Sequence, residues 1–244
     1  MEIAGRIVLV TGANRGIGAA VVDALVAAGA SKVYAAVRSV DAYRPRDPRI
    51  VPVALDVTDD ARVAEVATEL GDVEVLINNA GLSRGEPLLA ASDAKAAEVE
   101  MRVNYFGTLS MCRAFAPVLA RNGGGAIVNV LSIASRVSLP RIGSYSASKA
   151  AAFSLTQAIR AELAARGTLV VGVMPAFVDT DMARRVSAPK LTAGALAASI
   201  IDALRDDIED VYPGDAANVA LGLQSDPKAV EKRFASMFPA GSST

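Results

Sequence analysis

Short runs of β-branched residues alternate along the chain with alanine-rich stretches of helical periodicity. The apolar runs predict buried strands over Arg6–Val10, Lys32–Val37, Ile50–Leu55, Val73–Ile77, Ala126–Leu131, Leu169–Met174 and, more briefly, Asp210–Tyr212. The periodic stretches predict helices over Gly16–Ala28, Asp59–Leu70, Ser92–Arg121, Tyr145–Arg166, Thr192–Arg205 and Pro227–Met237. This alternation predicts a parallel, doubly wound α/β sheet of the Rossmann type, with helices on both faces.

Local signals refine this arrangement. Thr58 and Thr192 are predicted to cap the helices that follow them. The long helix Ser92–Arg121 is expected to bend near Gly107 and Pro117. Because neither an internal repeat nor a linker divides the chain, we expect one domain over 1–244, with a variable substrate loop at about 176–191 and a charged tail at about 226–244.

Composition restricts the chemistry. The 244 residues include no histidine and one cysteine, Cys112. A Ser-His-Asp triad, a His-ligated zinc and an intrachain disulfide are therefore excluded, and we expect no metal. Acid–base chemistry near neutral pH must use tyrosine, lysine, a carboxyl group, Cys112 or a terminus.

Charge and hydropathy restrict the partners. The formal net charge is −1, which argues against a nucleic-acid-coating role. Hydrophobic residues make up 52% of the chain, but much of that share is alanine, and no apolar run approaches the ~18 residues of a membrane span. The first residues lack the pattern of a signal peptide. We therefore expect a cytoplasmic protein with neither a nucleic-acid nor a membrane partner.

A glycine-rich segment, Thr11–Gly18 (TGANRGIG), follows the first predicted strand and opens the first helix. Gly12 suits a tight turn, while Gly16 and Gly18 permit close approach of phosphate and sheet. The helix start offers free N–H groups to an anion. Alone, the glycine pattern is weak, but its place after a strand favours dinucleotide binding over turn glycines.

The end of the second strand predicts which cofactor binds. An acidic residue there would accept the ribose 2′-hydroxyl of NAD, but this chain has Arg38 and no carboxylate before Asp41. Arg15 lies inside the glycine segment. Two guanidinium groups suit a 2′-phosphate, so NADP(H) is predicted, with two solvated surface arginines as the alternative.

Three further motifs occur in order: Asn78–Gly81 (NNAG) after the fourth strand, Ser132 after the fifth, and Tyr145–Lys149 (YSASK) opening a long helix. With the glycine segment, they make the chain resemble the short-chain dehydrogenase/reductase family, in its short single-domain branch, from about Arg6 to Thr180. The resemblance implies an NAD(P)-dependent oxidoreductase that acts on alcohol and carbonyl groups.

Chemistry supports the catalytic part of this resemblance. Tyr145 and Lys149 are spaced i and i+4, which places them on one helix face. A lysine cation is expected to lower the pKa of the tyrosine from about 10, so that Tyr145 can transfer a proton. Ser132 is suited to hydrogen-bond the substrate oxygen. In the family, an asparagine matched by Asn104 completes a catalytic tetrad and holds a water linked to the lysine.

The resemblance also assigns cofactor contacts. Asp56 matches a carboxylate that recognises adenine, with a turn or competing cap as the alternative. Asn79 matches a residue near the adenosine ribose, with a structural brace as the alternative. Thr180 matches a threonine near the nicotinamide amide, although Ala176 replaces the usual glycine after Pro175 and disfavours a positive φ there. The predicted cofactor residues are Gly12, Asn14, Arg15, Gly16, Ile17, Gly18, Arg38, Asp56, Val57, Asn79, Ala80, Gly81, Tyr145, Lys149, Pro175, Ala176, Val178 and Thr180.

Substrate contacts are expected from the loops Leu82–Leu88, Ile133–Gly143 and Ala176–Leu191. Their basic and apolar residues are Arg84, Arg136, Arg141, Arg184, Arg185 and Lys190, with Leu139, Ile142, Phe177 and Met182. A basic rim over an apolar floor would suit an acidic or carrier-borne substrate. Solvated loops around an apolar ketone explain the same residues, and we favour that interpretation.

The predicted function is an NADPH-dependent carbonyl reductase, reversible as an alcohol dehydrogenase, with a small-molecule substrate. The alternatives are a β-ketoacyl-thioester reductase working with a carrier protein, and a non-catalytic NADP-sensing protein, against which the complete tetrad argues. A homodimer or homotetramer is expected because the family associates through its two long helices. The usual closing strand is absent, since Asp210–Gly214 and a charged tail stand in its place, and this weakens inferences about tetramer contacts.

Overall fold

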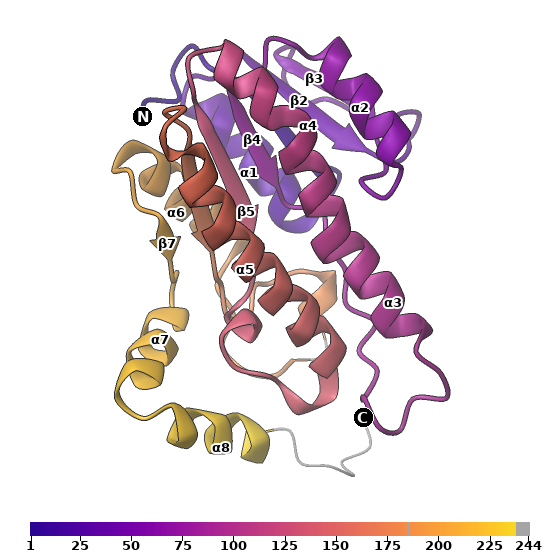
Figure 1. Ribbon diagram of the computed structural model, residues 1–244, viewed down its shortest axis with the longest axis vertical. Coiled ribbons are helices and arrows are strands. Elements are labelled where there is room, and N and C mark those ends of the chain that lie inside the picture. The colour runs from indigo at the N-terminus through magenta and orange to yellow at the C-terminus, as the bar shows by residue number, and fades with distance from the viewer. Residues whose placement is uncertain (185, 238–244) are drawn as a thin grey trace.

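A single parallel sheet organises the chain (Figure 1). The computed structural model describes residues 1–184 and 186–237. Within them, seven strands lie in the order β3-β2-β1-β4-β5-β6-β7. All neighbouring pairs are parallel. The strands are β1 (Ile7–Thr11), β2 (Lys32–Val37), β3 (Ile50–Ala54), β4 (Val75–Asn78), β5 (Ala126–Val130), β6 (Leu169–Val173) and β7 (Asp210–Val211). The predicted fold class is therefore confirmed.

Helices cover both faces of this sheet (Figure 1). They are α1 (Gly16–Ala27), α2 (Asp60–Glu69), α3 (Lys95–Met101), α4 (Thr108–Arg121), α5 (Gly143–Ala164), α6 (Ala193–Arg205), α7 (Ala216–Ser225) and α8 (Pro227–Met237). On one face, α1 and α6 pack against the sheet, while α2, α4 and α5 pack on the other. None of the helices described is long and apolar enough to cross a membrane.

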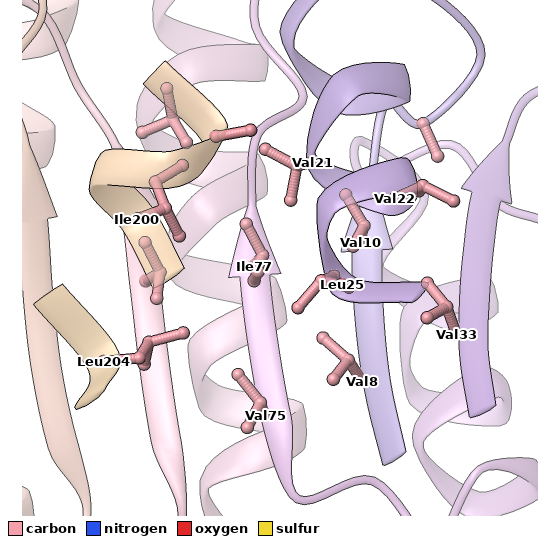
Figure 2. Packing of buried hydrophobic residues seen from close by; sticks show 14 of the residues in the cluster. Val8, Val10, Val21, Val22, Leu25, Val33, Val75, Ile77, Ile200 and Leu204 are labelled. Carbon is pink, nitrogen blue, oxygen red and sulfur yellow. The ribbon is translucent and has the colours of Figure 1, made fainter. Parts of the chain in front are cut away.

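The strands are apolar on both sides because both sides are covered. Val8 and Val10 of β1 face α1, where they meet Leu25, and Figure 2 shows Ile200 of α6 extending the same cluster. Leu9, between the two valines, belongs to the opposite cluster with α2, α4 and α5. Successive residues thus alternate between two apolar cores, which explains why the strands read as unbroken hydrophobic runs.

The predicted helix Ser92–Arg121 is interrupted. It begins at Lys95, and a π-helical turn over Arg102–Gly107 separates α3 from α4. A Cβ on Gly107 would lie 2.7 Å from Cγ2 of Val57, so this turn packs closely against the segment after β3. The change of helix type thus occurs near the predicted bend at Gly107, whereas α4 continues through Pro117.

The predicted cap at Thr192 is confirmed, since its hydroxyl accepts a hydrogen bond from the Ala195 amide at 3.1 Å. The predicted cap at Thr58 is wrong. Asp59 caps α2 by accepting from the Arg62 amide at 3.0 Å. A carboxylate is favoured there by the positive end of the helix dipole. The helix α7 was not predicted from the sequence.

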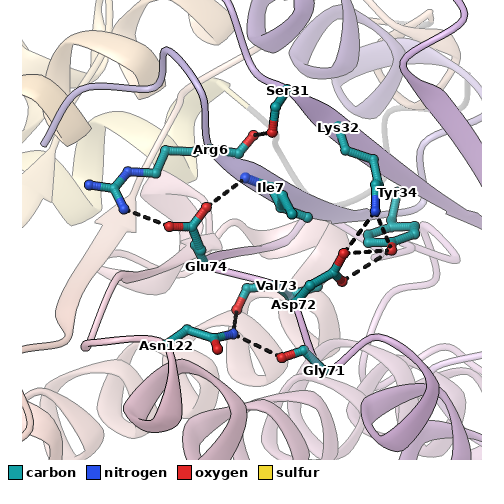
Figure 3. Close-up of polar contacts among 10 residues, drawn as sticks. All are labelled: Arg6, Ile7, Ser31, Lys32, Tyr34, Gly71, Asp72, Val73, Glu74 and Asn122. Atoms are coloured by element: carbon teal, nitrogen blue, oxygen red, sulfur yellow. Dashed lines mark hydrogen bonds and ion pairs between the residues drawn. The ribbon is translucent and has the colours of Figure 1, made fainter.

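Polar side chains tie the segment just before β4 to the amino ends of β1 and β2 (Figure 3). Glu74 accepts from the Arg6 guanidinium at 2.6 Å and from the Ile7 amide at 3.0 Å. Asp72 pairs with Lys32 at 2.8 Å. Half-exposed pairs of this kind contribute ~0–1 kcal/mol each, so their main effect is to fix where β4 enters the sheet.

Candidate active site

A cleft of about 840 Å³ opens at the carboxyl ends of β1, β2 and β4. The strand order reverses between β1 and β4, which is where ligands bind in open α/β sheets. The predicted cofactor residues that line it are Gly12, Asn14, Arg15, Gly16, Ile17, Gly18, Arg38, Asp56, Val57, Asn79, Ala80, Gly81, Tyr145, Lys149 and Thr180. Those predicted but not among its lining residues are Pro175, Ala176 and Val178.

The glycine loop is shaped to receive an anion. Gly12 has a φ of +65°, a left-handed conformation that disfavours side chains. A Cβ on Gly18 would lie 2.2 Å from the Gly12 carbonyl oxygen, so only glycine allows this approach of helix to loop. At the start of α1, Arg15 makes no side-chain cap in the described part of the chain. The first-turn amides of α1 can therefore donate to a phosphate, and the loop fits a dinucleotide.

Asn79 braces that loop. Its side-chain amide donates to the carbonyl oxygens of Thr11 at 2.9 Å and Gly12 at 3.1 Å. The Thr11 hydroxyl oxygen in turn accepts from the amides of Asn79 and Ala80, both at 3.0 Å. These bonds join the ends of β1 and β4, which supports the bracing role left open by the sequence. A contact between Asn79 and ribose stays a prediction.

Asp56 occupies a turn at the far end of the cleft. Its Oδ1 accepts from the Thr58 amide at 2.9 Å and from the Thr58 hydroxyl at 2.7 Å. The hydrogen bond from the Thr58 backbone amide is the main cause of the lowered pKa of Asp56, and the nearby Arg38 and Arg102 lower it further. Asp56 is thus a turn residue and also an ionised group on the cleft wall.

More arginines line the cleft than the two expected. Arg38 and Arg15 are joined by Arg44 and Arg46, from the loop after β2, and by Arg102 from the π-helical turn. For Arg44 and Arg46, the signal in the sequence was their position shortly after the end of β2, but the segment from 41 to 49 was interpreted only as a connecting loop. Four of these arginines, Arg15, Arg38, Arg44 and Arg46, lie in the loops that follow β1 and β2, where a 2′-phosphate is expected.

The predicted catalytic residues Ser132, Tyr145 and Lys149 come together beside the cleft, all of them buried. Ser132 follows β5, and its side chain hydrogen-bonds that of Tyr145 on α5. Lys149, one turn further along α5, donates from Nζ to the Val130 carbonyl at 2.8 Å. This Nζ atom lies 5.9 Å from the centroid of the Tyr145 ring.

Burial sets the protonation of this cluster. It raises the pKa of Tyr145 to about 12, against the lowering effect of the Ser132 hydrogen bond, and Glu100 raises it further. Burial also lowers the pKa of Lys149 to about 8. The expected net lowering of the Tyr145 pKa is therefore wrong for this structure, because desolvation of the tyrosinate outweighs the effect of the nearby lysine charge. Tyr145 holds its proton at neutral pH and is suited to donate it.

Asn104 lies in the π-helical turn and is almost completely buried. Its Oδ1 accepts from the Leu82 amide, and its Nδ2 donates to the Leu82 carbonyl and the Ser148 hydroxyl, each at 2.9 Å. The side chain thus links the segment after β4 to α5. π-Helical turns often mark functional sites. The expected water between Asn104 and Lys149 stays a prediction.

The predicted basic rim is dispersed. Arg84 lines the cleft. Arg136 instead donates to the Tyr212 hydroxyl and lies 5.0 Å from the ring centroid of Phe153. Arg184 pairs with Asp181 at 2.5 Å, and Arg185 lies outside the described residues.

Three features define a Rossmann-type oxidoreductase site: the cleft where the strand order reverses, the start of α1 without a side-chain cap, and the adjoining Ser-Tyr-Lys cluster. The chain belongs to the short-chain dehydrogenase family, because the family model described as short chain dehydrogenase matches residues 6–191. The predicted enzyme class, an oxidoreductase acting on alcohol and carbonyl groups, is thereby confirmed.

Known proteins are similar over most of the chain. A solved short chain dehydrogenase from Burkholderia cenocepacia J2315, in complex with NADP, has a TM-score of 0.92 and 47% identity, covering 96% of this chain and 99% of its own. Short chain dehydrogenase mpl6 of Monascus purpureus is 35% identical over 195 residues, 73% of this chain and 67% of the relative. The 3-oxoacyl-(acyl-carrier-protein) reductase FabG of Escherichia coli (strain K12) is 31% identical over 194 residues, which cover 77% of this chain and 79% of the relative.

Proposed function

We propose that this protein is an NADPH-dependent carbonyl reductase that also works in reverse as an alcohol dehydrogenase. The observation that carries the proposal is the buried cluster of Ser132, Tyr145 and Lys149 beside a dinucleotide-shaped cleft. When bound, the reduced nicotinamide supplies the hydride that the carbonyl carbon accepts. The protein must then orient the carbonyl and provide one proton.

The cluster provides that proton. Tyr145 is protonated at neutral pH, since burial raises its pKa to about 12, and its hydroxyl can donate to the carbonyl oxygen as that oxygen gains negative charge. Ser132 donates to the same oxygen and stabilises the developing alkoxide. The Val130 carbonyl holds the Lys149 ammonium beside the tyrosine, where its charge favours the tyrosinate left behind.

The residues of the cleft support NADP(H) as the cofactor. Arg38, Arg44 and Arg46 lie after the end of β2, where a 2′-phosphate would sit. Arg15, in the glycine loop, lines the same cleft and pairs with Asp181 at 2.8 Å. Among these residues no carboxylate takes the place that favours NAD. The similar protein from Burkholderia cenocepacia J2315 is in complex with NADP, which agrees with this assignment.

A β-ketoacyl-thioester reductase is the second candidate. The similarity to FabG proteins favours it, as does Arg84 at the cleft, which could meet an anionic carrier. The dispersal of Arg136 and Arg184 onto other partners argues against an extended basic docking rim. We therefore retain small ketones as the primary substrate class.

An NADPH-oxidation screen over ketones, ketoesters and β-ketoacyl-thioesters, with NADH as control, tests both candidates. Turnover of free ketones with NADPH supports the main proposal. Turnover confined to thioesters supports the second candidate, and binding of NADPH without any turnover would favour a sensing protein. One domain over 1–244, a cytoplasmic location and self-association into a dimer or tetramer stay predictions beside this proposal.

A further inference from the structure

One buried acidic side chain has no part in the proposed chemistry. Glu100 of α3 is 0% exposed, and Lys149 is the other buried charged residue among those described. A buried carboxyl group is unfavourable unless hydrogen bonds replace the water it loses. Its partners therefore show what keeps it in place.

The hydrogen bonding of Glu100 depends on one backbone amide. Its Oε1 accepts from the Arg84 amide at 2.6 Å. Its Oε2 is buried and has no hydrogen-bond partner among the described residues. Because the Arg84 amide is the one donor recorded for this carboxyl group, the position of the Arg84 segment and the burial of Glu100 depend on each other.

The same segment is held a second time. Asn104, about one turn after Glu100, binds both backbone groups of Leu82. Two side chains of one helical region thus hold alternate residues of the segment that follows β4. Both Leu82 and Arg84 line the cleft, so these bonds fix part of its wall.

This wall adjoins the reactive tyrosine. The helix α3 packs against α5, which carries Tyr145. The Glu100 carboxylate also contributes to raising the pKa of Tyr145, so the two groups are within electrostatic reach. The loop that Glu100 holds is therefore one side of the space in which a carbonyl group would meet the Tyr145 hydroxyl.

We propose that Glu100 is a positioning residue for the substrate loop Leu82–Leu88, which it holds against α3 through the Arg84 amide. The proposal rests on the proposed function for the identity of the reaction. It assigns Glu100 no contact with substrate. Loss of the acceptor should loosen the loop and weaken substrate binding, while the cofactor loop, which is held by Asn79, is unaffected.

Replacement variants separate this role from a general structural one. Glu100→Leu puts an apolar side chain of similar size in place of the carboxyl group and leaves the Arg84 amide without this acceptor. Glu100→Gln keeps an oxygen that can accept from the Arg84 amide. Glu98→Gln is the matched control, because Glu98 is an exposed residue on the same helix.

The first measurement needs no turnover. Trypsin cuts after arginine, and Arg84 is exposed within the loop. In the full chain, Glu100→Leu should raise the rate of cleavage at Arg84–Gly85 about tenfold, because cleavage follows the open population and a charged hydrogen bond is lost. Glu100→Gln and Glu98→Gln should stay within about threefold of wild type. Cleavage after the exposed Arg46 is the internal reference and should not change.

The second measurement uses a carbonyl substrate identified in the NADPH-oxidation screen. Glu100→Leu should raise its KM about tenfold, with kcat and the KM for NADPH within about threefold. Wild-type cleavage at Arg84–Gly85 in Glu100→Leu, equal loosening in Glu100→Gln, or a loosened loop with unchanged KM would each overturn the proposal. If even the wild type turns over nothing, the proposed function fails, whereas the proteolysis result still decides whether Glu100 holds the loop.

Discussion

Lys149 directs its ammonium group to the Val130 carbonyl at 2.8 Å, while the same nitrogen lies 5.9 Å from the Tyr145 ring centroid. The two side chains share one face of α5, and both are withdrawn from water. Their pKa values consequently move toward the neutral forms, to about 12 for the tyrosine and about 8 for the lysine. The pair is thus set to deliver a proton from tyrosine rather than to hold a tyrosinate.

Replacement of the proton donor should abolish turnover without removing the cofactor. Tyr145→Phe is expected to lower kcat by about 10²–10⁴-fold, because proton transfer to the carbonyl oxygen is lost. NADPH affinity, measured by fluorescence titration, should stay within about threefold. Tyr105→Phe is the control, since Tyr105 contacts Phe106 edge to face in the π-helical turn and takes no part in the cluster. Wild-type turnover in Tyr145→Phe would exclude the mechanism.

The charge at the end of β2 should determine cofactor preference. Arg38→Asp is expected to lower the NADPH-to-NADH ratio of kcat/KM by at least about tenfold, because a carboxylate repels a 2′-phosphate and accepts from a 2′-hydroxyl. The measurement is steady-state kinetics with both cofactors. Arg166→Asp, an exposed arginine after α5, should leave the ratio unchanged. An unaltered ratio in Arg38→Asp would show that other residues select the cofactor.

Lys149 should make stability depend on pH. Its pKa is lowered by burial from 10.5 to about 8, so the unfolded chain binds the extra proton between these values and stability rises with pH there. Below about pH 8, burial of the Lys149 ammonium group destabilises the folded state by on the order of 3 kcal/mol. This destabilisation is relieved as the pH increases.

Urea unfolding of wild type and Lys149→Met measures this effect. The free energy of unfolding of wild type, relative to the variant, should rise by about 2 kcal/mol from about pH 7 to about pH 9.5. Loss of the hydrogen bond to Val130 shifts the difference by an amount independent of pH, so the slope is the test. A difference that stays constant over this range would contradict a depressed lysine pKa.

Self-association should involve the outer face of α3 and the π-helical turn. Phe106 is 47% exposed there, and an apolar hollow is formed with Ala97 and Met101. Phe106→Glu is expected to give a monomer in light scattering after size exclusion, because it places a charge in an apolar interface. Leu221→Glu, on the exposed surface of α7, is the control and should keep the wild-type mass. A wild-type mass for Phe106→Glu would place the interface elsewhere.

The elements that could be predicted from the sequence are those with local signals. Strand β1 and the loop after it combine a β-branched run with glycines, and these residue patterns are compatible with few other local structures. The π-helical turn escaped prediction because one extra residue scarcely alters helical periodicity. The helix α7 escaped because its surroundings, the loop from Ile133 to Leu139, come from a distant part of the chain.

The site was predictable as a set of residues but not as an electrostatic environment. Motif order predicted that Ser132, Tyr145 and Lys149 would meet. The pKa of Tyr145 depends instead on how completely α5 and its neighbours exclude water, and on Glu100 from α3. Likewise, the partner of Arg136 is Tyr212, which lies 76 positions away. Such long-range pairings leave no signal in a single sequence.

The π-helical turn between α3 and α4 has a consequence for how this chain tolerates changes in length. Each residue of a helix advances its faces by about 100°. Deleting one residue from Arg102–Gly107 would therefore preserve two good helices yet rotate one against the other. Either Phe115 of α4 would leave the core, or Glu100 and Asn104 would lose the loop that they hold. The extra residue thus acts as a phase shift that lets one helical region serve both the core and the cleft.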